Sequence, residues 1–135
     1  MRNKKLDQLI IQLENYLECW KQFNRYLNLA RSKKFDIDDE TQFLEIKTVM
    51  TQELEMIMSS IESGSPTKDE VHTLIASAPS LRYLSEQNEG ALRNLENQWH
   101  KIYIAWQSML GQLKVQQRNL ESQSMLSSLV SRKKS

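Results

Sequence analysis

Apolar residues in the first part of the chain follow a helical repeat. Steps of three and four residues separate Leu6, Leu9, Leu13, Tyr16, Trp20, Phe23, Leu27 and Ala30. This spacing puts the side chains on one narrow face of a continuous helix, which is stabilised by packing against other helices. The pattern predicts a helix over residues 3–32 with coiled-coil-like packing.

A second helix and a short third helix are predicted in the middle of the chain. The second helix follows a linker over residues 33–37 and ends near residue 62, with Asp36, Asp38 and Asp39 as candidate N-caps. Its apolar residues repeat at helical spacing at Phe43, Ile46, Met50, Leu54, Ile57 and Ile61. Ser63, Gly64, Ser65 and Pro66 then form the strongest helix-breaking segment of the sequence. Thr67, followed by Glu70 three residues later, has the spacing of a capping box and predicts a short helix over residues 68–77.

The remainder of the chain predicts one long helix. Pro79 ends the short helix, and residues 81–120 contain no comparable breaker. Its apolar face is Leu81, Leu84, Leu92, Leu95, Trp99, Ile102, Trp106, Met109 and Leu113. Asn88 falls on the same face, and we interpret it as a polar residue that sets the packing register. At 1.5 Å per residue this helix would be about 60 Å long, against about 45 Å for the first helix, so it is overlong.

These elements predict an all-α fold, an antiparallel bundle of three long helices plus one short connecting helix. Only three Gly and two Pro occur in 135 residues, which leaves few of the turns that a sheet protein needs. We expect one bundle domain over residues 1–119 and a polar, partly disordered basic tail over residues 120–135. An up, down and up order would place Leu6 beside Leu84 at one end and Ala30 beside Met109 at the other.

Charge is unevenly distributed along the chain despite a net charge of +1. Residues 1–35 contain eight basic and three acidic side chains, residues 36–70 contain two and ten, and residues 71–135 contain eight and four. An acidic middle helix packed between basic neighbours would bring opposite charges together. The asymmetry is therefore interpreted as internal, and no nucleic-acid partner is expected.

The residues that most often carry chemistry form no catalytic or metal-binding pattern. Cys19 is the only cysteine and has no His nearby in sequence to activate it. His72 and His100 lack a Cys or carboxylate three or four residues later, as a helical metal motif would require. We expect no enzyme activity, cofactor or metal. The lone cysteine favours a cytoplasmic location, and no segment has the roughly 20 apolar residues of a membrane span.

Two apolar groups near the end of the chain are candidate partner-binding residues. The first spreads around the last helix further than a small core can cover, and predicts a homodimer through the second half of that helix: Tyr103, Ile104, Trp106, Leu110 and Val115. The second would form an apolar patch if the tail were helical: Met125, Leu126, Leu129 and Val130. The alternative for the second group is a frayed or disordered tail.

The function predicted from these features is a small protein–protein interaction module of the adaptor, assembly or export-chaperone type. The layout of the chain resembles that of flagellar and type III export chaperones. It has a long helix, an acidic second helix, a break, and a long last helix with a polar tail. This resemblance implies a protein partner but assigns no residue a role. The alternative is a binder of nucleic acid or anionic membranes through the basic Arg132, Lys133 and Lys134. A catalytic or cofactor-binding bundle is a third, less favoured hypothesis.

Overall fold

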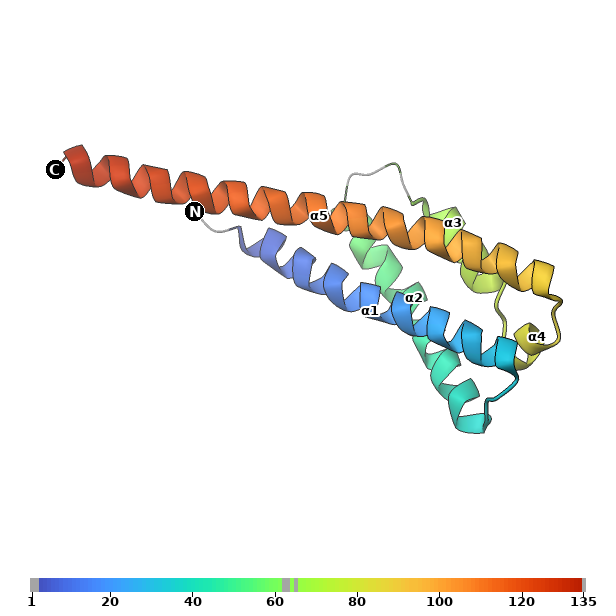
Figure 1. Ribbon diagram of the computed structural model, residues 1–135. Coiled ribbons are helices and arrows are strands. Elements are labelled where there is room, and N and C mark those ends of the chain that lie inside the picture. The colour runs from blue at the N-terminus through green and yellow to red at the C-terminus, as the bar shows by residue number, and fades with distance from the viewer. Residues whose placement is uncertain (1–2, 62–63, 65, 135) are drawn as a thin grey trace.

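The computed structural model describes residues 3–61, 64 and 66–134, without the side chains of residues 127, 128 and 130–134. Its elements are α1 (Lys4–Ser32), α2 (Ile37–Ser60), α3 (Lys68–Ala76), α4 (Leu81–Ser85) and α5 (Glu89–Lys134) (Figure 1). Within these residues no β-strand is present. The predicted all-α fold is confirmed.

Helix α1 has the boundaries and the buried face that its heptad pattern predicts. Asn3 caps its start by accepting a hydrogen bond from the Leu6 backbone N–H at 3.2 Å. Lys33 ends it in the left-handed conformation, with φ of 59°. All eight residues of the predicted stripe are buried except Leu9, which is half-buried.

Helix α2 packs antiparallel to α1. The rings of Phe23 on α1 and Phe43 on α2 are 5.5 Å apart. Closer to the start of α1, the Tyr16 hydroxyl donates a hydrogen bond of 2.7 Å to the carbonyl of Met50, which lies later in α2. Later residues of α2 therefore contact earlier residues of α1, as a helical hairpin requires.

Helices α3 and α4 carry the chain back along α2. Near the end of α2, Glu55 forms a 2.8 Å ion pair with Lys68, which begins α3. Near the start of α2, the Glu40 carboxylate accepts a 2.8 Å hydrogen bond from the backbone N–H of Leu81, which begins α4. The chain thus returns to the end of the molecule where α1 finishes and α2 begins (Figure 1).

Helix α5 consequently runs antiparallel to α1 and not parallel to it. Three contacts along the pair fix this direction, namely Arg31 with Glu89 at 3.3 Å, the Trp20 carbonyl with Trp99 Nε1 at 2.9 Å, and Glu14 with Lys114 at 3.7 Å. The predicted up, down and up order is wrong, because Leu84 lies at the opposite end of the molecule from Leu6. The error arose because α3 carries the chain back along α2, so that α5 starts at the end of the molecule where α1 finishes.

The predicted last helix is divided into α4 and α5, so two short helices, not one, connect α2 to α5. The chain leaves helical geometry after Ser85, and Asn88 starts α5 by accepting a 2.8 Å hydrogen bond from the Ala91 backbone N–H. Asn88 is exposed, so its interpretation as an interior register residue is wrong. A polar residue that continues the spacing of an apolar stripe can be the N-cap of a new helix as well as a residue of the helix interior.

Aromatic side chains occupy the centre of the bundle. The Tyr16 ring meets the Trp106 ring edge to face at 5.5 Å, and Trp20 lies 6.5 Å from Trp106. These side chains, with Phe23 and Phe43, are fully buried. Among the residues that the structure describes, no charged or hydrogen-bonding residue apart from tyrosine and tryptophan is buried, so apolar packing holds the bundle together.

The C-terminal part of α5 extends beyond the bundle. Gln117 donates a 2.7 Å hydrogen bond to Asp7 in the first turn of α1, and α5 continues in the same direction to Lys134 (Figure 1). The overlong last helix is therefore present. Residues 120–134 are helical and belong to α5.

None of the helices in the described residues combines the length and the apolar character needed to cross a lipid bilayer.

Candidate interaction surface

The first predicted apolar group divides between the core and the surface. Trp106 and Tyr103 are buried against α1, so the prediction that they exceed what the bundle can cover is wrong for both. Leu110 is half-buried. Ile104 and Val115 are exposed. Antiparallel docking of α1 along α5 covers more of the α5 circumference than periodicity alone suggested.

The second predicted group is exposed along the projecting part of α5. The exposed side chains are Met125, Leu126 and Leu129. The side chain of Val130 lies outside the described residues. The predicted apolar patch is therefore present on a helix for the three residues whose side chains are described.

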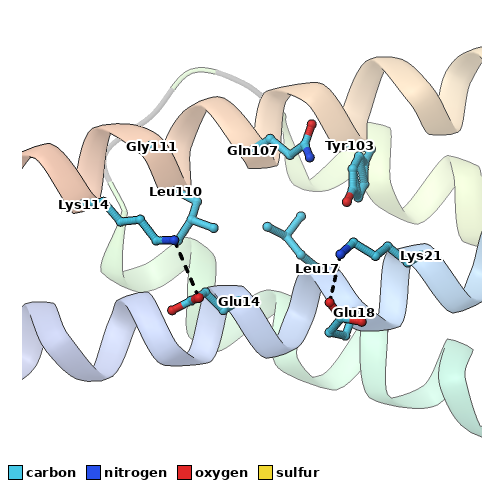
Figure 2. Close-up of a pocket in the computed structure, with 9 residues that line it drawn as sticks. All are labelled: Glu14, Leu17, Glu18, Lys21, Tyr103, Gln107, Leu110, Gly111 and Lys114. Atoms are coloured by element: carbon cyan, nitrogen blue, oxygen red, sulfur yellow. Dashed lines mark hydrogen bonds and ion pairs between the residues drawn. The ribbon is translucent and has the colours of Figure 1, made fainter.

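A groove of about 330 Å³ runs between α1 and α5 on the side away from α2 (Figure 2). Leu17 and Leu110 point toward one another at its floor. The residues that line it are Glu14, Leu17, Glu18, Lys21, Tyr103, Gln107, Leu110, Gly111 and Lys114. Periodicity alone did not identify the α1 residues of this set, because they lie beside the heptad stripe and meet α5 only in the antiparallel arrangement.

Two ion pairs lie at the rim of this groove, and one of them crosses it. Glu14 pairs with Lys114 across the two helices at 3.7 Å, and Glu18 pairs with Lys21 on α1 at 3.0 Å (Figure 2). The hydrogen bond to Glu18 raises the pKa of the Lys21 ammonium. Positive and negative charges are thus already matched within the groove, and the pairs are too exposed to add much stability.

A separate line of exposed residues follows the side of α5 opposite its buried face. We name it the outer stripe, and its members are Ile104, Ser108, Gly111, Val115, Ser122, Leu126 and Leu129. Ile104, Val115 and Leu126 are spaced by 11 residues, which is close to three helical turns, so they share one face. The exposed fractions of Ile104, Val115, Leu126 and Leu129 are 49%, 46%, 61% and 52%.

Gly111 lies in the middle of the outer stripe. A glycine inside a helix costs about 1 kcal/mol relative to alanine. A Cβ atom added at Gly111 would have no heavy atom within 4 Å beyond its local helix backbone. Packing within the chain therefore does not require this glycine.

Cys19 does not have the environment of an activated thiol. Burial, followed by the nearby Glu53 and Glu18 carboxylates, raises its pKa and so disfavours the thiolate. Over the described parts of the chain, no three His, Cys, Asp or Glu side chains are grouped so as to hold a metal ion.

No family model, curated protein or solved structure matches this chain. The candidate surface is accordingly defined by its own residues. It consists of the outer stripe of α5 and the neighbouring groove, which adjoin at Gly111.

Proposed function

We propose that the protein is a helical protein–protein interaction module, without catalytic activity, that binds a helix along the outer stripe of α5. One observation supports this most directly. Four exposed aliphatic side chains share one face of a helix that continues beyond its own bundle. Burying apolar surface contributes about 25 cal/mol per Å², and an amphipathic helix is a common partner for such a face.

Charge favours a partner helix with acidic flanks. Residues 114–134 contain five basic side chains and one acidic side chain. Opposite charges beside an apolar interface increase association rates and disfavour wrong partners. Adaptor, assembly and export-chaperone roles in the cytoplasm all fit this type of binding. The proposal includes the homodimer expected from the sequence, since a second copy also provides a helix.

Affinity capture from the native source with matched charge variants tests this proposal. Leu126→Glu adds a carboxylate to the outer stripe, whereas Ile37→Glu adds one at the start of α2, where the side chain is 83% exposed. We expect proteins retained by the full chain to be lost with Leu126→Glu and kept with Ile37→Glu. Circular dichroism of each variant verifies that the helical fold is retained.

Retention of the same proteins by both variants would contradict the proposal. Capture that disappears steeply with added salt, and depends on Arg132, Lys133 and Lys134 without depending on Leu126, would favour the alternative of nucleic-acid or anionic-membrane binding.

A further inference from the structure

We infer that Met125 is a site of reversible oxidation, and that a peroxide weakens binding at the outer stripe by converting this methionine to its sulfoxide. This inference rests on the proposed function, because it names a regulation of the same surface. It follows from the exposure of the Met125 side chain, from its aliphatic neighbours and from the different surroundings of the other sulfur atoms.

Burial divides the methionine side chains into two groups. Met50 is fully buried, Met109 is 5% exposed, and Met58 is partly buried against the core. Met56 on α2 and Met125 on α5 are 59% and 68% exposed. The rate of sulfur oxidation follows the access of the oxidant from water. Among the described residues, Met125 and Met56 are therefore the methionines most open to oxidation in the folded protein.

Met125 stands in an apolar face of α5. Leu129 is one helical turn after Met125, and around the helix axis it lies between Met125 and Leu126. All three side chains are exposed. Together they span about 100° of the helix, which is the width of an ordinary apolar face. A helix bound on Leu126 and Leu129 therefore also covers the thioether of Met125.

Met56 stands among polar side chains instead. Gln52 and Ser60 lie one turn away from it along α2, and the hydroxyls of Ser59 and Ser60 donate to the Met56 carbonyl at 2.8 Å and 3.1 Å. Oxidation here adds a polar group to a surface that is already polar. Met56 is thus a control of the same chemistry and similar exposure, outside the outer stripe.

The thiol of Cys19 is a poorer target for the same oxidant. Cysteine reacts with peroxides as the thiolate, and burial together with the Glu53 and Glu18 carboxylates raises the pKa of Cys19. A thioether carries no proton, so Met125 needs no ionisation before it reacts. The exposed thioether, and not the thiol, is therefore the sulfur that responds to a peroxide.

The oxidation transfers one oxygen atom to the side chain. The Met125 sulfur attacks one oxygen of hydrogen peroxide, an S–O bond forms, the O–O bond breaks, and the other oxygen leaves as water with both protons. Sulfur loses two electrons and the peroxide gains them. The product is polar where the reduced side chain is apolar, and methionine sulfoxide reductases reverse the change. Covering the sulfoxide with an apolar partner costs free energy, because its oxygen loses hydrogen bonds to water.

Peptide mapping by mass spectrometry is the first test. The full chain is treated with dilute hydrogen peroxide, and the reaction is stopped with free methionine. We expect Met125 and Met56 to be oxidised at similar rates, and Met50 and Met109 to be oxidised at least about tenfold more slowly. Oxidation of Met125 as slow as that of Met109 would overturn the inference.

Retention on a hydrophobic column gives a readout that needs no partner. Met56→Leu leaves Met125 as the exposed methionine, and Met125→Leu leaves Met56. Oxidation should shorten the retention of the Met56→Leu chain more than that of the Met125→Leu chain, because only the first loses part of the apolar face that contains Leu126 and Leu129. Equal shifts would show that Met125 does not belong to an apolar face.

Protein capture before and after oxidation tests the effect on binding. Proteins retained by the Met56→Leu chain should be bound at least about tenfold more weakly after oxidation, and reductase treatment should restore them. Binding by the Met125→Leu chain should be the same before and after oxidation. Circular dichroism should show the helical fold unchanged by the treatment. Equal loss of binding in the two variants, or no loss in Met56→Leu, would overturn the inference.

The outcomes separate this inference from the proposed function. Proteins that are lost on Leu126→Glu, but are still retained by the oxidised full chain, would exclude regulation at Met125 and leave the interaction module standing. Proteins that are retained on Leu126→Glu would contradict the proposed function, and the inference with it, because binding would then not depend on the outer stripe.

Discussion

At the scale of single residues, burial separates positions that look alike in the sequence. Ile104 and Trp106 are two residues apart, and both were predicted to lie on an uncovered surface. Trp106 is enclosed by Tyr16 and Trp20, whereas Ile104 is directed away from the bundle. The same substitution should therefore have different consequences at the two positions.

We predict that Trp106→Ala lowers the free energy of unfolding by about 3–5 kcal/mol, because it leaves a large cavity in the core. Ile104→Ala should change it by less than about 1 kcal/mol when measured at a concentration that keeps the chain monomeric. Urea denaturation followed by circular dichroism measures both. Similar losses at the two positions would contradict the assigned burial.

Tyr16 provides a pH-dependent prediction at the same scale. Burial raises the pKa of its hydroxyl far above the ordinary value of 10, while the side chain donates to the Met50 carbonyl. Above pH 10 the unfolded chain loses this proton and the folded chain keeps it, so the free energy of unfolding falls as pH rises. Tyr16→Phe should cost about 1 kcal/mol at pH 8 and weaken the decline above pH 10.

Urea denaturation at pH 8 and at pH 11 measures this difference. Tyr83→Phe is the matched control, because Tyr83 is exposed on α4. It should leave both the stability at pH 8 and the decline at high pH unchanged. An equal decline in the Tyr16→Phe chain would show that another group is responsible.

At the scale of elements, helix caps decide where α5 begins. Asn88 interrupts the apolar stripe between Leu84 and Leu92 at helical spacing, which suggested a core position in one uninterrupted helix. Its side chain instead accepts from the Ala91 backbone N–H, and the chain changes direction between α4 and α5. The cap also frees α4 to pack against the end of α1.

We predict that Asn88→Ala lowers the free energy of unfolding by about 1 kcal/mol, because the first turn of α5 loses its side-chain acceptor. Asn88→Asp should retain stability, since a carboxylate also accepts this bond and suits the helix N-terminus. Asn94→Ala, in an exposed position within α5, is the control and should be neutral. Thermal and urea denaturation measure these changes. An interior role for Asn88 would instead make Asn88→Leu stabilising.

At the scale of the whole molecule, the bundle and the projecting part of α5 differ in how much of their apolar surface is covered. Near the start of α1, Gln117 of α5 donates a hydrogen bond to Asp7. Leu126 and Leu129 lie beyond that point and are exposed. The bundle holds α5 in place, and the projecting segment leaves its apolar side chains exposed, which is the surface proposed to bind another chain.

We predict that a chain ending at Ser122 keeps the free energy of unfolding of the full chain to within about 1 kcal/mol under monomeric conditions. Its self-association should weaken at least tenfold, because Leu126 and Leu129 are removed. Urea denaturation at low concentration and sedimentation at high concentration give the two values. Loss of folding on truncation would mean that the projecting segment belongs to the bundle.

The sequence by itself determined the helices and most of the core. Periodicity is a local property of the chain, so the stripes on α1 and α2, the caps at Asp36 and Thr67, and the break before α3 all followed from residues close together in sequence. The exposed aliphatic residues of the tail were found in the same way. A helix N-cap and an interior polar residue can both lie three or four residues from the neighbouring apolar positions, however. The spacing alone could not distinguish the two, and Asn88 was assigned wrongly.

Only the tertiary structure decided the direction of α5 and the side of that helix left uncovered. An apolar stripe packs equally well against a parallel or an antiparallel neighbour, and the segment between α2 and α5 is long enough for either. The chain takes the returning path, along which Glu40 contacts Leu81 and Lys68 contacts Glu55. Antiparallel docking then buried Tyr103 and Trp106 and left Ile104 and Gly111 facing outward, because α1 covers only one side of α5.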